Sequence, residues 1–531
     1  MAVFTECPLS PALFLERAAS VFAHRIAIID GDRRFTYREF GDRARRLAGF
    51  LTDAGIQPGD RVAALCVNSH VMLELHNGVP MAGAVLVPMN IRLSVGELAY
   101  VMEHSGARLL LATEELAETA RKIAEQAKVR LILGGSPETE YEQLLAGARP
   151  HSVPCTDEMG LLAINYTSGS TGRPKGVMYS HRGAYLQALA MAHHNRMGLE
   201  SAYLWTLPMF HCDGWCFTWG VTAAGATHVC LRKADPALAW SMMCDHGITH
   251  LSGAPTVLTM IAEAAAAVPH RRPSRPVHAN TGGAPPSPAL LARLAKLDIK
   301  VTHLYGLTES YGPVMICEWQ PEWSAESLEQ QARLNARQGI GNVVTGGVDV
   351  FDGDGHPVPW DAKTMGEIVL RGNNTMLGYY RDEAATRAAT INGWFRTGDL
   401  GVRYPDGYVE LRDRAKDIII SGGENVASVE VERVLVEHPA VLEAAVIGRS
   451  HEKWGEIPVA FVVLRQGQAA TAAELIEFVR GRIAHFKAPR EIRFEELPKT
   501  STGKIQKHVL RDRAAAGEEK NAGSRGTAAT R

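Results

Sequence analysis

Short apolar runs with the character of strands alternate with longer helical windows along most of the N-terminal part of this chain. Apolar runs lie at 61–67, 84–89, 108–113 and 130–134, and a helical window occupies 115–128. Such alternation is typical of α/β folds, in which crossover helices join parallel strands. We therefore predict an α/β fold whose large N-terminal domain has mostly parallel sheets flanked by helices.

The pattern begins again after a charged segment at 413–416, which marks a joint in the chain. The elements that follow form a smaller α+β unit of about 100 residues, near the usual size of a domain. They are an apolar run at 418–420, a helix from about Ser428, strands at 444–449 and 459–464, and a helix at 471–484. The end of the chain is small, polar and charged, and we expect it to be disordered. The predicted boundaries are 1–412 for the N-terminal domain, 413–416 for the joint, 417–511 for the C-terminal domain and 512–531 for the tail.

Length, charge and hydropathy exclude several classes of protein. At 531 residues the chain is long enough for more than one domain. A formal net charge of −2 argues against a nucleic-acid binder, whose affinity rests on many Lys/Arg–phosphate contacts. The best candidate for a membrane span, 78–90, is short and broken by Pro80 and Pro88, and the N-terminus lacks the pattern of a secretion signal. We expect a cytoplasmic protein without a nucleic-acid partner or stable membrane insertion, and we leave a homodimer open.

The cysteines also suit a cytoplasmic protein. The 8 cysteines are scattered without a C-x-x-C pair, so we interpret them as reduced thiols. His211, Cys212 and Cys216 lie close together and raise a metal hypothesis. A second pair at zinc-ligand spacing is missing, so we do not expect a metal there.

The segment YTSGSTGRPKG at 166–176 is the clearest candidate for a binding loop. It follows the apolar run 161–164, which we predict to be a buried strand. A strand that leads into a loop of small residues directs backbone N–H groups at a phosphate, the loop hydroxyls add donors, and Lys175 adds a positive charge. The spacing differs from that of the P-loop, so a Walker-type ATPase is not implied. A flexible Gly/Ser surface loop remains the alternative.

Two carboxylates stand in segments suited to a nucleotide. Glu309, within HLYGLTES at 303–310, is the kind of lone carboxylate that a magnesium ion shared with phosphates needs, and the alternative is a helix-capping residue. Asp399, within WFRTGDL at 394–400, follows a glycine at the expected end of a strand, where a carboxylate accepts both hydrogen bonds of a ribose diol. The alternative for Asp399 is a hairpin turn.

Three further segments are weaker signals when taken singly. HANTGGAPP at 278–286 contains a glycine pair that permits close approach of the backbone to a flat ligand, or simply a turn before a helix. DRAKDIIISGGENV at 413–426 mixes charges with an isoleucine run and a second glycine pair, and a solvated turn is the alternative. PKTSTGKIQK at 498–507 places Lys504 in a polar loop, where most lysines are only solvated.

The order of these motifs is far more specific than any one of them. Together they resemble the adenylate-forming acyl-CoA synthetase superfamily, which includes acyl- and aryl-CoA ligases, firefly luciferase and peptide-synthetase adenylation domains. The resemblance covers roughly residues 10 to 511. It implies that a carboxylic acid attacks the α-phosphate of ATP to give an acyl-adenylate and pyrophosphate. A mobile C-terminal domain then rotates about a hinge at 413–416, and a thiol takes the acyl group with loss of AMP.

The resemblance also assigns roles to residues at matching positions. It implies ATP, Mg²⁺ and coenzyme A as cofactor and co-substrates. Catalytic residues would be Lys504, which bridges the carboxylate and the α-phosphate, with His211, Thr308 and Glu309. Glu309 and Thr167 would serve the metal. Cofactor-binding residues would be Thr167, Ser168, Gly169, Ser170, Thr171, Gly172, Lys175, Gly283, Ala284, Pro285, Tyr305, Gly306, Asp399, Arg414, Lys416 at the hinge, Gly422 and Gly423. Substrate-binding residues would be Trp215, Gly282, Gly306 and Pro313.

The acid itself is indicated only by class. The segments 317–339 and 421–432 look most like a subgroup with plant acyl-activating enzymes and bacterial methylthiopropionate ligases, which implies a short- to medium-chain or small aromatic acid. Trp215 and Trp219 are bulky and would shorten the acyl pocket. Asp213 stands where related chains usually have an uncharged residue such as Asn. It could meet a polar or amino-bearing substrate, but we favour a hydrogen bond from its side chain to the local backbone.

We therefore expect an AMP-forming acid–thiol ligase of fatty acid metabolism. An adenylating enzyme that passes its activated group to a carrier protein or an amine is the second hypothesis, and a nucleotide-binding protein without turnover is the third. The intact C-terminal domain with its glycine pair, and the basic segment HFKAPR at 485–490, favour CoA as the acceptor.

Overall fold

The computed structural model describes residues 7–167, 174–283, 286, 288–421, 424–451, 454–499 and 505–514. It divides into two compact units, residues 1–348 with 370–395, and residues 349–369 with 396–531. The chain passes between the units inside strands, because the divisions fall within β16, β17 and β20. The predicted joint at 413–416 lies inside the second unit.

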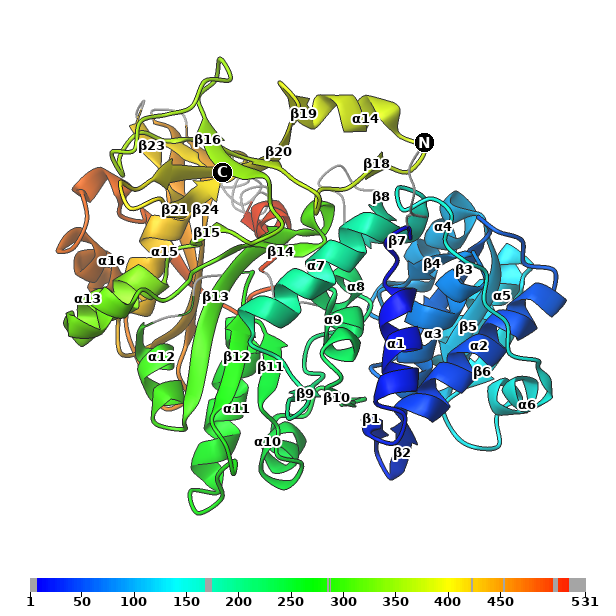
Figure 1. The fold of residues 1–531 in the computed structure, drawn as a ribbon. Coiled ribbons are helices and arrows are strands. Elements are labelled where there is room, and N and C mark those ends of the chain that lie inside the picture. The colour runs from blue at the N-terminus through cyan, green and yellow to red at the C-terminus, as the bar shows by residue number, and fades with distance from the viewer. Residues whose placement is uncertain are drawn as a thin grey trace, which may run out of the picture. The chain divides into compact units, whose positions relative to one another are not determined.

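The first unit is built on a 7-stranded and a 9-stranded sheet (Figure 1). Neighbouring strands in the centre of each sheet are parallel, and antiparallel strands stand toward the edges, as in the pairs β7–β8 and β1–β2. In spatial order, the first sheet contains β18 (Gly378–Tyr379), β8 (Lys175–Ser180), β7 (Leu161–Thr167), β4 (Val85–Pro88), β3 (Arg61–Leu65), β5 (Ala107–Thr113) and β6 (Arg130–Gly134). The second contains β15 (Ile340–Gly341), β14 (Gly312–Ile316), β13 (Ile299–Leu307), β12 (Val277–Thr281), β11 (His250–Gly253), β9 (Ala202–Leu204), β10 (Thr227–Val229), β1 (Ile26–Asp30) and β2 (Arg33–Thr36). The prediction of mostly parallel sheets in an α/β fold is confirmed.

Helices cover both faces of these sheets, and three apolar clusters show which face each helix buries. One cluster packs α4 (Val95–Ser105) and α5 (Ala117–Ala127) on the 7-stranded sheet. A second packs α10 (Pro236–Asp245), α11 (Pro255–Ala267) and α12 (Pro288–Ala295) on the 9-stranded sheet. The largest cluster joins both sheets through α1 (Ala12–Val21), α2 (Tyr37–Asp53), α3 (His70–Met81), α7 (His181–His194) and α9 (Phe217–Ala223). Strands of both sheets therefore pack on one shared core.

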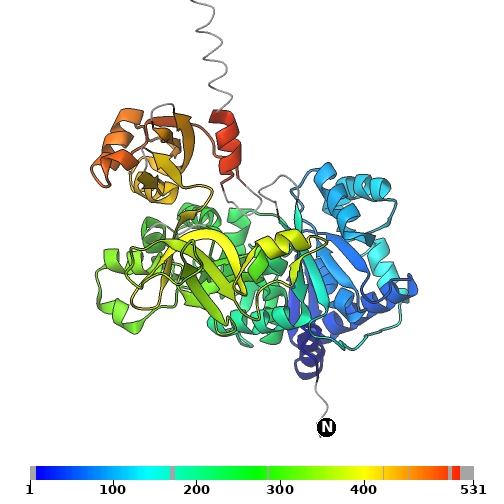
Figure 2. The same ribbon diagram turned by 90° about the horizontal axis from the view of Figure 1, so that it is seen from above.

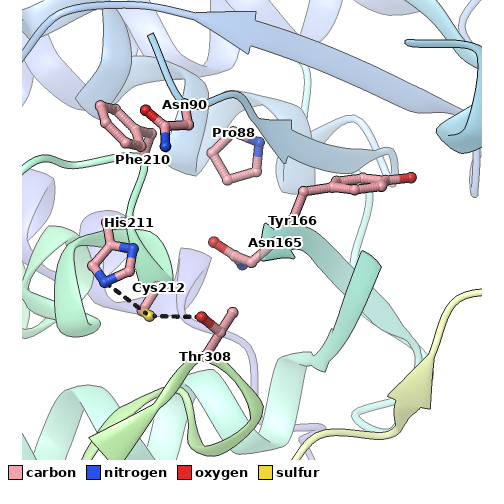
Figure 3. A pocket seen from close by; sticks show the side chains of 8 residues that line it. All are labelled: Pro88, Asn90, Asn165, Tyr166, Phe210, His211, Cys212 and Thr308. Carbon is pink, nitrogen blue, oxygen red and sulfur yellow. Dashed lines mark hydrogen bonds between the residues drawn. The ribbon is translucent and has the colours of Figure 1, made fainter. Parts of the chain in front are cut away.

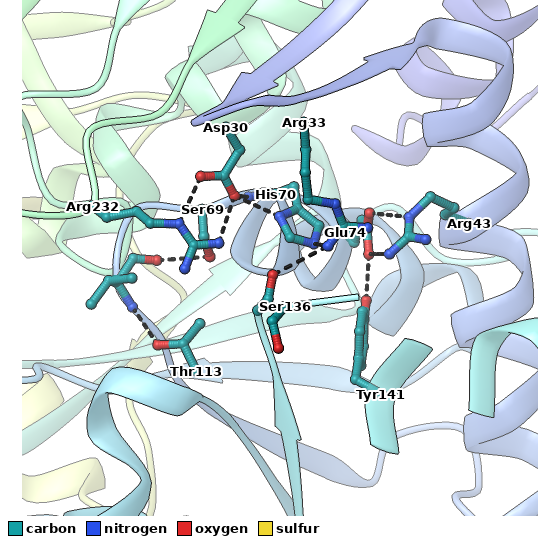
Figure 4. A network of polar contacts seen from close by, with 12 residues as sticks. Asp30, Arg33, Arg43, Ser69, His70, Glu74, Thr113, Ser136, Tyr141 and Arg232 are labelled. Atoms are coloured by element: carbon teal, nitrogen blue, oxygen red, sulfur yellow. Dashed lines mark hydrogen bonds and ion pairs between the residues drawn. The ribbon is translucent and has the colours of Figure 1, made fainter. Parts of the chain in front are cut away.

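A buried network of charges ties the N-terminal helices to these strands (Figure 4). Glu74 is fully buried, and it accepts hydrogen bonds from Arg43 Nε at 2.6 Å and from the Tyr141 hydroxyl at 2.6 Å. Asp30 is bonded to His70 Nδ1 and to Arg232, whose Nε lies 2.7 Å away. Burial opposes the charge of Asp30, but His70 and Arg232 hold the pKa of its carboxyl well below the usual value. Each buried carboxylate thus has a cationic partner, which a buried charge requires.

Two smaller sheets complete the fold. In the first, β16 (Gly347–Phe351), β17 (Gly366–Arg371), β20 (Trp394–Arg403) and β19 (Thr390–Ile391) lie in that order, and β21 (Val409–Arg414) pairs with β20. In the second, β23 (Glu424–Val426), β22 (Ile419–Ser421), β25 (Gly455–Leu464) and β24 (Val441–His451) lie in that order, and β26 (Glu491–Phe494) pairs with β25. Helices α15 (Ser428–Val436) and α16 (Ala472–Arg480) share an apolar cluster with one face of the second sheet. Leu510 and Ala514, on a C-terminal helical stretch at 507–514 (Figure 2, red), pack on the other face.

The remaining helices are α6 (Glu140–Gly147), α8 (Cys212–Trp215), α13 (Leu328–Asn335) and α14 (Glu383–Ala388). The helical stretch at 507–514 extends three residues into the predicted tail, and 515–531 lie outside the residues that the structure describes. In the described parts of the chain, helices are either too short or too polar to cross a bilayer.

Candidate active site

The segment predicted to be a binding loop begins and ends in two neighbouring strands. The buried run at 161–164 lies in β7, which ends at Thr167, and Thr167 stands opposite Lys175 of antiparallel β8. The residues between them, which include the predicted phosphate-binding Ser168, Gly169, Ser170, Thr171 and Gly172, lie outside the described part of the chain. Both ends of the loop are thus anchored in adjacent strands.

Tyr379 brings two of the predicted site residues together. The Lys175 ammonium lies 4.9 Å from the centre of the Tyr379 ring, and the Tyr379 hydroxyl donates to Glu309 Oε1 at 2.8 Å. Burial and the nearby Glu309 carboxylate raise the pKa of the Tyr379 hydroxyl, so it stays a donor at neutral pH. A cation and a carboxylate therefore contact different parts of one phenol, the ring and the hydroxyl. Sequence reasoning missed Tyr379, because β18 pairs with β8 from a distant part of the chain.

Glu309 does not cap a helix. It lies in the 3-10 turn Thr308–Ser310, where the Ser310 hydroxyl accepts the Leu307 N–H at 2.9 Å. The Glu309 carboxylate is therefore available to Tyr379, and the capping alternative is wrong.

A small pocket opens where parallel strands β4 and β7 end (Figure 3). It brings together His211 and Thr308, two predicted catalytic residues that are far apart in the sequence. Cys212 lies between them, with Sγ 3.8 Å from His211 Nε2 and 3.4 Å from Thr308 Oγ1. The carboxyl ends of parallel strands are the usual place for ligands in α/β sheets. The pocket is lined by Pro88, Asn90, Asn165, Tyr166, Phe210, His211, Cys212 and Thr308.

A left-handed turn shapes one wall of this site. From Cys212 to Cys216 the φ angles are 49°, 43°, 59°, 56° and 60°, and only Gly214 is a glycine. Each non-glycine residue in this conformation costs about 1–2 kcal/mol. Backbone bonds hold the turn, from Gly214 N–H to His211 O at 2.8 Å and from Cys216 N–H to Asp213 O at 3.1 Å. Strain of this kind is concentrated at functional sites.

The turn buries Asp213 without a partner for its carboxylate. Asp213 is 0% exposed, and neither carboxylate oxygen has a hydrogen-bond partner. This geometry does not confirm our prediction that the side chain bonds to the local backbone. Burial raises the pKa of Asp213 to about 7, although the neighbouring Asn165 amide opposes part of that shift.

Trp215 packs against two glycines. A Cβ atom at Gly282 would lie 3.3 Å from the indole, and one at Gly312 would lie 3.0 Å from it. The two glycines therefore leave room for the ring. Trp219, which we predicted to shorten the pocket, is instead buried in the core, where its Nε1 donates to His76 O at 3.0 Å.

The other site residues predicted in this region lie on or near strands β13 and β12, and they differ in exposure. Tyr305 and Gly306 lie on β13, where a Cβ atom at Gly306 would be 1.8 Å from the backbone oxygen of Gly312. Pro313 is buried, and its carbonyl accepts a hydrogen bond from Gln187 Nε2 at 2.6 Å. Gly283 is exposed, with a φ of 88°. The predicted Ala284 and Pro285 lie outside the described residues.

In the second unit the structure pairs two predicted ribose-binding residues. Asp399 and Arg414 stand opposite each other on β20 and β21, with Arg414 Nε 3.3 Å from Asp399 Oδ1. Asp399 lies inside β20, so its predicted place at the end of a strand is wrong. Gly398 takes a φ of 72° just before it, and β20 continues past this irregularity to Arg403. Lys416 lies in the turn after β21, where partial burial and Arg414 lower the pKa of its amine.

Lys504, Gly422 and Gly423 lie outside the described residues, but the segments that flank Lys504 are defined. Lys499 and Ile505 form a β-bridge on either side of it. Lys507 then pairs with the half-buried Glu432, with Nζ 2.7 Å from Oε1. In the basic segment 485–490, Lys487 is paired with Glu430 at 2.7 Å.

No group of three or more His, Cys, Asp or Glu side chains in the described ranges is arranged to hold a metal ion. A magnesium ion would here depend on Glu309 together with the phosphates of its nucleotide. All eight cysteines are described, and each is a free thiol.

Comparison with known proteins gives consistent matches. The model of the AMP-binding enzyme family matches residues 15–380, and that of the AMP-binding enzyme C-terminal domain matches residues 430–504. The chain is 42% identical to 4-hydroxybutyrate–CoA ligase 2 of Metallosphaera sedula, over 96% of this chain and 95% of the other. It is also 42% identical to a peroxisomal acetate/butyrate–CoA ligase of Arabidopsis thaliana, over 95% and 94%. The crystal structure of ATP-bound MatB from Rhodopseudomonas palustris superposes with a TM-score of 0.83 at 28% identity, covering 95% of this chain and 99% of that one.

Proposed function

We propose that this chain, which belongs to the AMP-binding enzyme family and is an ATP-dependent acid–CoA ligase, activates short- to medium-chain or small aromatic carboxylic acids. The observation that carries the proposal is the small pocket that His211, Cys212 and Thr308 share at the ends of β4 and β7. The names of the relatives support small acids, because they specify 4-hydroxybutyrate, acetate and butyrate.

The family's reaction uses ATP, Mg²⁺ and CoA, and the first unit offers groups that suit the charged partners. We assign the triphosphate to Lys175 and to the loop from Thr167 to Gly172. Glu309, oriented by Tyr379, would hold the magnesium ion, with Thr167 beside the phosphates. The bound ion would neutralise phosphate charge and so lower the repulsion between the carboxylate and the triphosphate.

The reaction requires a carboxylate oxygen to bond to the α-phosphorus while the bond to pyrophosphate breaks. Thr308 would donate its hydroxyl to the oxygens at this centre, and His211 would orient the acid. Tyr305, Gly306, Gly282, Gly283, Ala284 and Pro285 would form the walls for adenine and acyl group, with Trp215 and Pro313. Positioning and charge stabilisation account for most catalysis in such a step.

We assign the ribose to Asp399 and Arg414 and the bridging charge to Lys504. The second half-reaction would follow rotation about the hinge at Lys416, with Gly422 and Gly423 beside the pantetheine chain of CoA. The separate family matches at 15–380 and 430–504 support the division into domains 1–412 and 417–511 with a tail at 512–531.

A screen of pyrophosphate release tests the function, with acids from acetate to decanoate and with benzoate and cinnamate, each with and without CoA. We expect release of pyrophosphate with small acids and formation of the acyl-CoA only when CoA is present. Failure of every acid to support AMP formation would contradict the proposal.

Replacement of Lys504 tests the division of labour between the two half-reactions. Lys504→Ala is expected to lower acyl-AMP formation by at least about 100-fold, because the charge that bridges acid and α-phosphate is removed. The conversion of pre-formed acyl-AMP to acyl-CoA is expected to survive. Unchanged pyrophosphate release would remove this assignment.

We also propose a cytoplasmic location, leave a homodimer open, and propose no nucleic-acid partner. The eight free thiols suit a reducing compartment, and the net charge of −2 suits the absence of nucleic acid. Cell fractionation and light scattering test the first two points.

A further inference from the structure

One asparagine side chain holds the backbone that leads to His211. Asn68 follows β3, and its Nδ2 donates to Trp205 O at 2.7 Å and to Leu207 O at 3.0 Å. Its Oδ1 accepts the Met209 N–H at 2.8 Å. The oxygen and the nitrogen of a single amide thus both bond to one short segment, 205–209.

This segment has little regular structure to hold it. It lies between β9 and the left-handed turn, in neither a helix nor a strand, although Trp205, Leu207 and Met209 are buried. The beginning of the segment is bonded to a neighbouring strand, because the Trp205 N–H donates to Val229 O at 2.9 Å. Toward its end the bonds of Asn68 to Leu207 and Met209 satisfy buried backbone groups, which need partners. The path of the chain at 207–209 is therefore set by Asn68.

The chain on both sides of Asn68 is itself fixed. The preceding Val67 N–H donates to Thr113 Oγ1, at the end of β5, at 3.2 Å. Helix α3 begins just after Asn68, and there the His70 N–H donates to Asp30 Oδ2 at 3.0 Å in the buried network of charges (Figure 4). Asn68 thus links a well-anchored end of the 7-stranded sheet to a segment that leaves the 9-stranded sheet.

The segment that Asn68 holds leads directly into the pocket. Phe210, His211 and Cys212 follow Met209 without a gap, and all three line the pocket (Figure 3). A shift at Met209 would therefore be passed on to the imidazole of His211. A misplacement of about 1 Å at a reacting centre can lower a rate by about 100-fold, even when its cause lies elsewhere.

We propose that Asn68 is a positioning residue, which sets the place of His211 in the acyl pocket and thereby the binding of the acid. It acts through the backbone of 205–209 rather than on the acid itself. This inference rests on the proposed function, because it takes His211 as the residue that orients the acid.

Steady-state kinetics of pyrophosphate release test the inference on the full-length enzyme, with butyrate or the most active acid of the screen. Asn68→Ala removes all three bonds, so we expect the KM for the acid to rise by about tenfold or more, with the KM for ATP within about twofold of wild type. Asn77→Ala is the matched control, because the Asn77 amide donates to Leu73 O within α3, and we expect it to change neither KM. An unchanged KM for the acid in Asn68→Ala, or an equal rise in both KM values, overturns the inference. If the wild type releases no pyrophosphate with any acid, the proposed function fails instead.

A double-mutant cycle with His211 separates positioning from a merely structural role. If Asn68 acts through His211, adding Asn68→Ala to His211→Ala raises the KM for the acid by less than about twofold, since the residue to be positioned is already gone. An equal effect of Asn68→Ala in both backgrounds overturns the inference. Asn68→Asp has the same shape, keeps the acceptor for the Met209 N–H and loses both donors, so it carries the same two tests if Asn68→Ala does not fold.

Discussion

Removal of one hydroxyl group, in Tyr379→Phe, isolates the contact that joins the predicted metal ligand to the predicted phosphate lysine. The change deletes the 2.8 Å bond to Glu309 Oε1 and keeps the ring on which the Lys175 ammonium lies at 4.9 Å. Glu309 would then lose the donor that fixes its carboxylate, so its orientation toward a magnesium ion would no longer be set.

The size of the effect follows from the type of bond. A hydrogen bond to a charged group contributes about 1.5 to 3 kcal/mol. Tyr379 and Glu309 are both only half-buried, so the lower end applies, which corresponds to about a tenfold change in an equilibrium constant. Loss of a group that orients a metal ligand typically lowers the affinity for the metal by about 10- to 100-fold.

The assay is pyrophosphate release as a function of free Mg²⁺ at fixed ATP and acid. We expect the Mg²⁺ concentration for half-maximal rate to rise about tenfold in Tyr379→Phe, with most of the rate regained at high Mg²⁺. Tyr404→Phe is the matched control, because the Tyr404 hydroxyl bonds to Glu410 in the second unit. An unchanged Mg²⁺ dependence in Tyr379→Phe, or an equal shift in the control, would refute the reasoning.

Three further changes test the fold around the site. Arg43→Met leaves the buried Glu74 without its cation, so we expect the free energy of unfolding to fall by about 3 to 5 kcal/mol. Adding Glu74→Gln should restore part of this loss, and urea denaturation measures both variants. Asp213 has its pKa raised to about 7, so the folded state binds a proton that the unfolded state releases near pH 4, and stability falls between these values by about 4 kcal/mol. The melting temperature of Asp213→Asn relative to wild type should therefore rise from pH 4 to pH 7 and then level off, whereas a constant difference contradicts this. Gly306→Ala would place a Cβ atom 1.8 Å from a backbone oxygen, so we expect a destabilisation of about 2 to 4 kcal/mol in thermal unfolding, and an unchanged melting temperature contradicts the packing.

Regular elements with clear periodicity could be predicted from the sequence. The run at 130–134 coincides with β6, and the run at 108–113 falls inside β5, because continuous apolar residues signal a buried parallel strand. The helix predicted at 471–484 ends earlier, at Arg480, since Gly481 follows it directly. Local pattern thus located elements better than it located their ends.

The site could be predicted only in part, because its decisive contacts are tertiary. Tyr379 meets Glu309 across 70 residues of sequence, and no local pattern signals such a pair. The left-handed turn at 212–216 could not be predicted either, because four of its five residues disfavour that conformation. One signal was available for Asp213, a charge in an otherwise apolar and aromatic segment, but its burial without a partner became visible only in three dimensions.

The most direct test of acid adenylation follows the oxygen atoms. Butyrate or 4-hydroxybutyrate labelled with ¹⁸O in both carboxyl oxygens is turned over with ATP, Mg²⁺ and CoA, and the products are analysed by mass spectrometry. If the carboxylate attacks the α-phosphate, one labelled oxygen appears in AMP and the other remains in the acyl-CoA carbonyl. Label in inorganic phosphate together with formation of ADP, or AMP without label, would contradict the account.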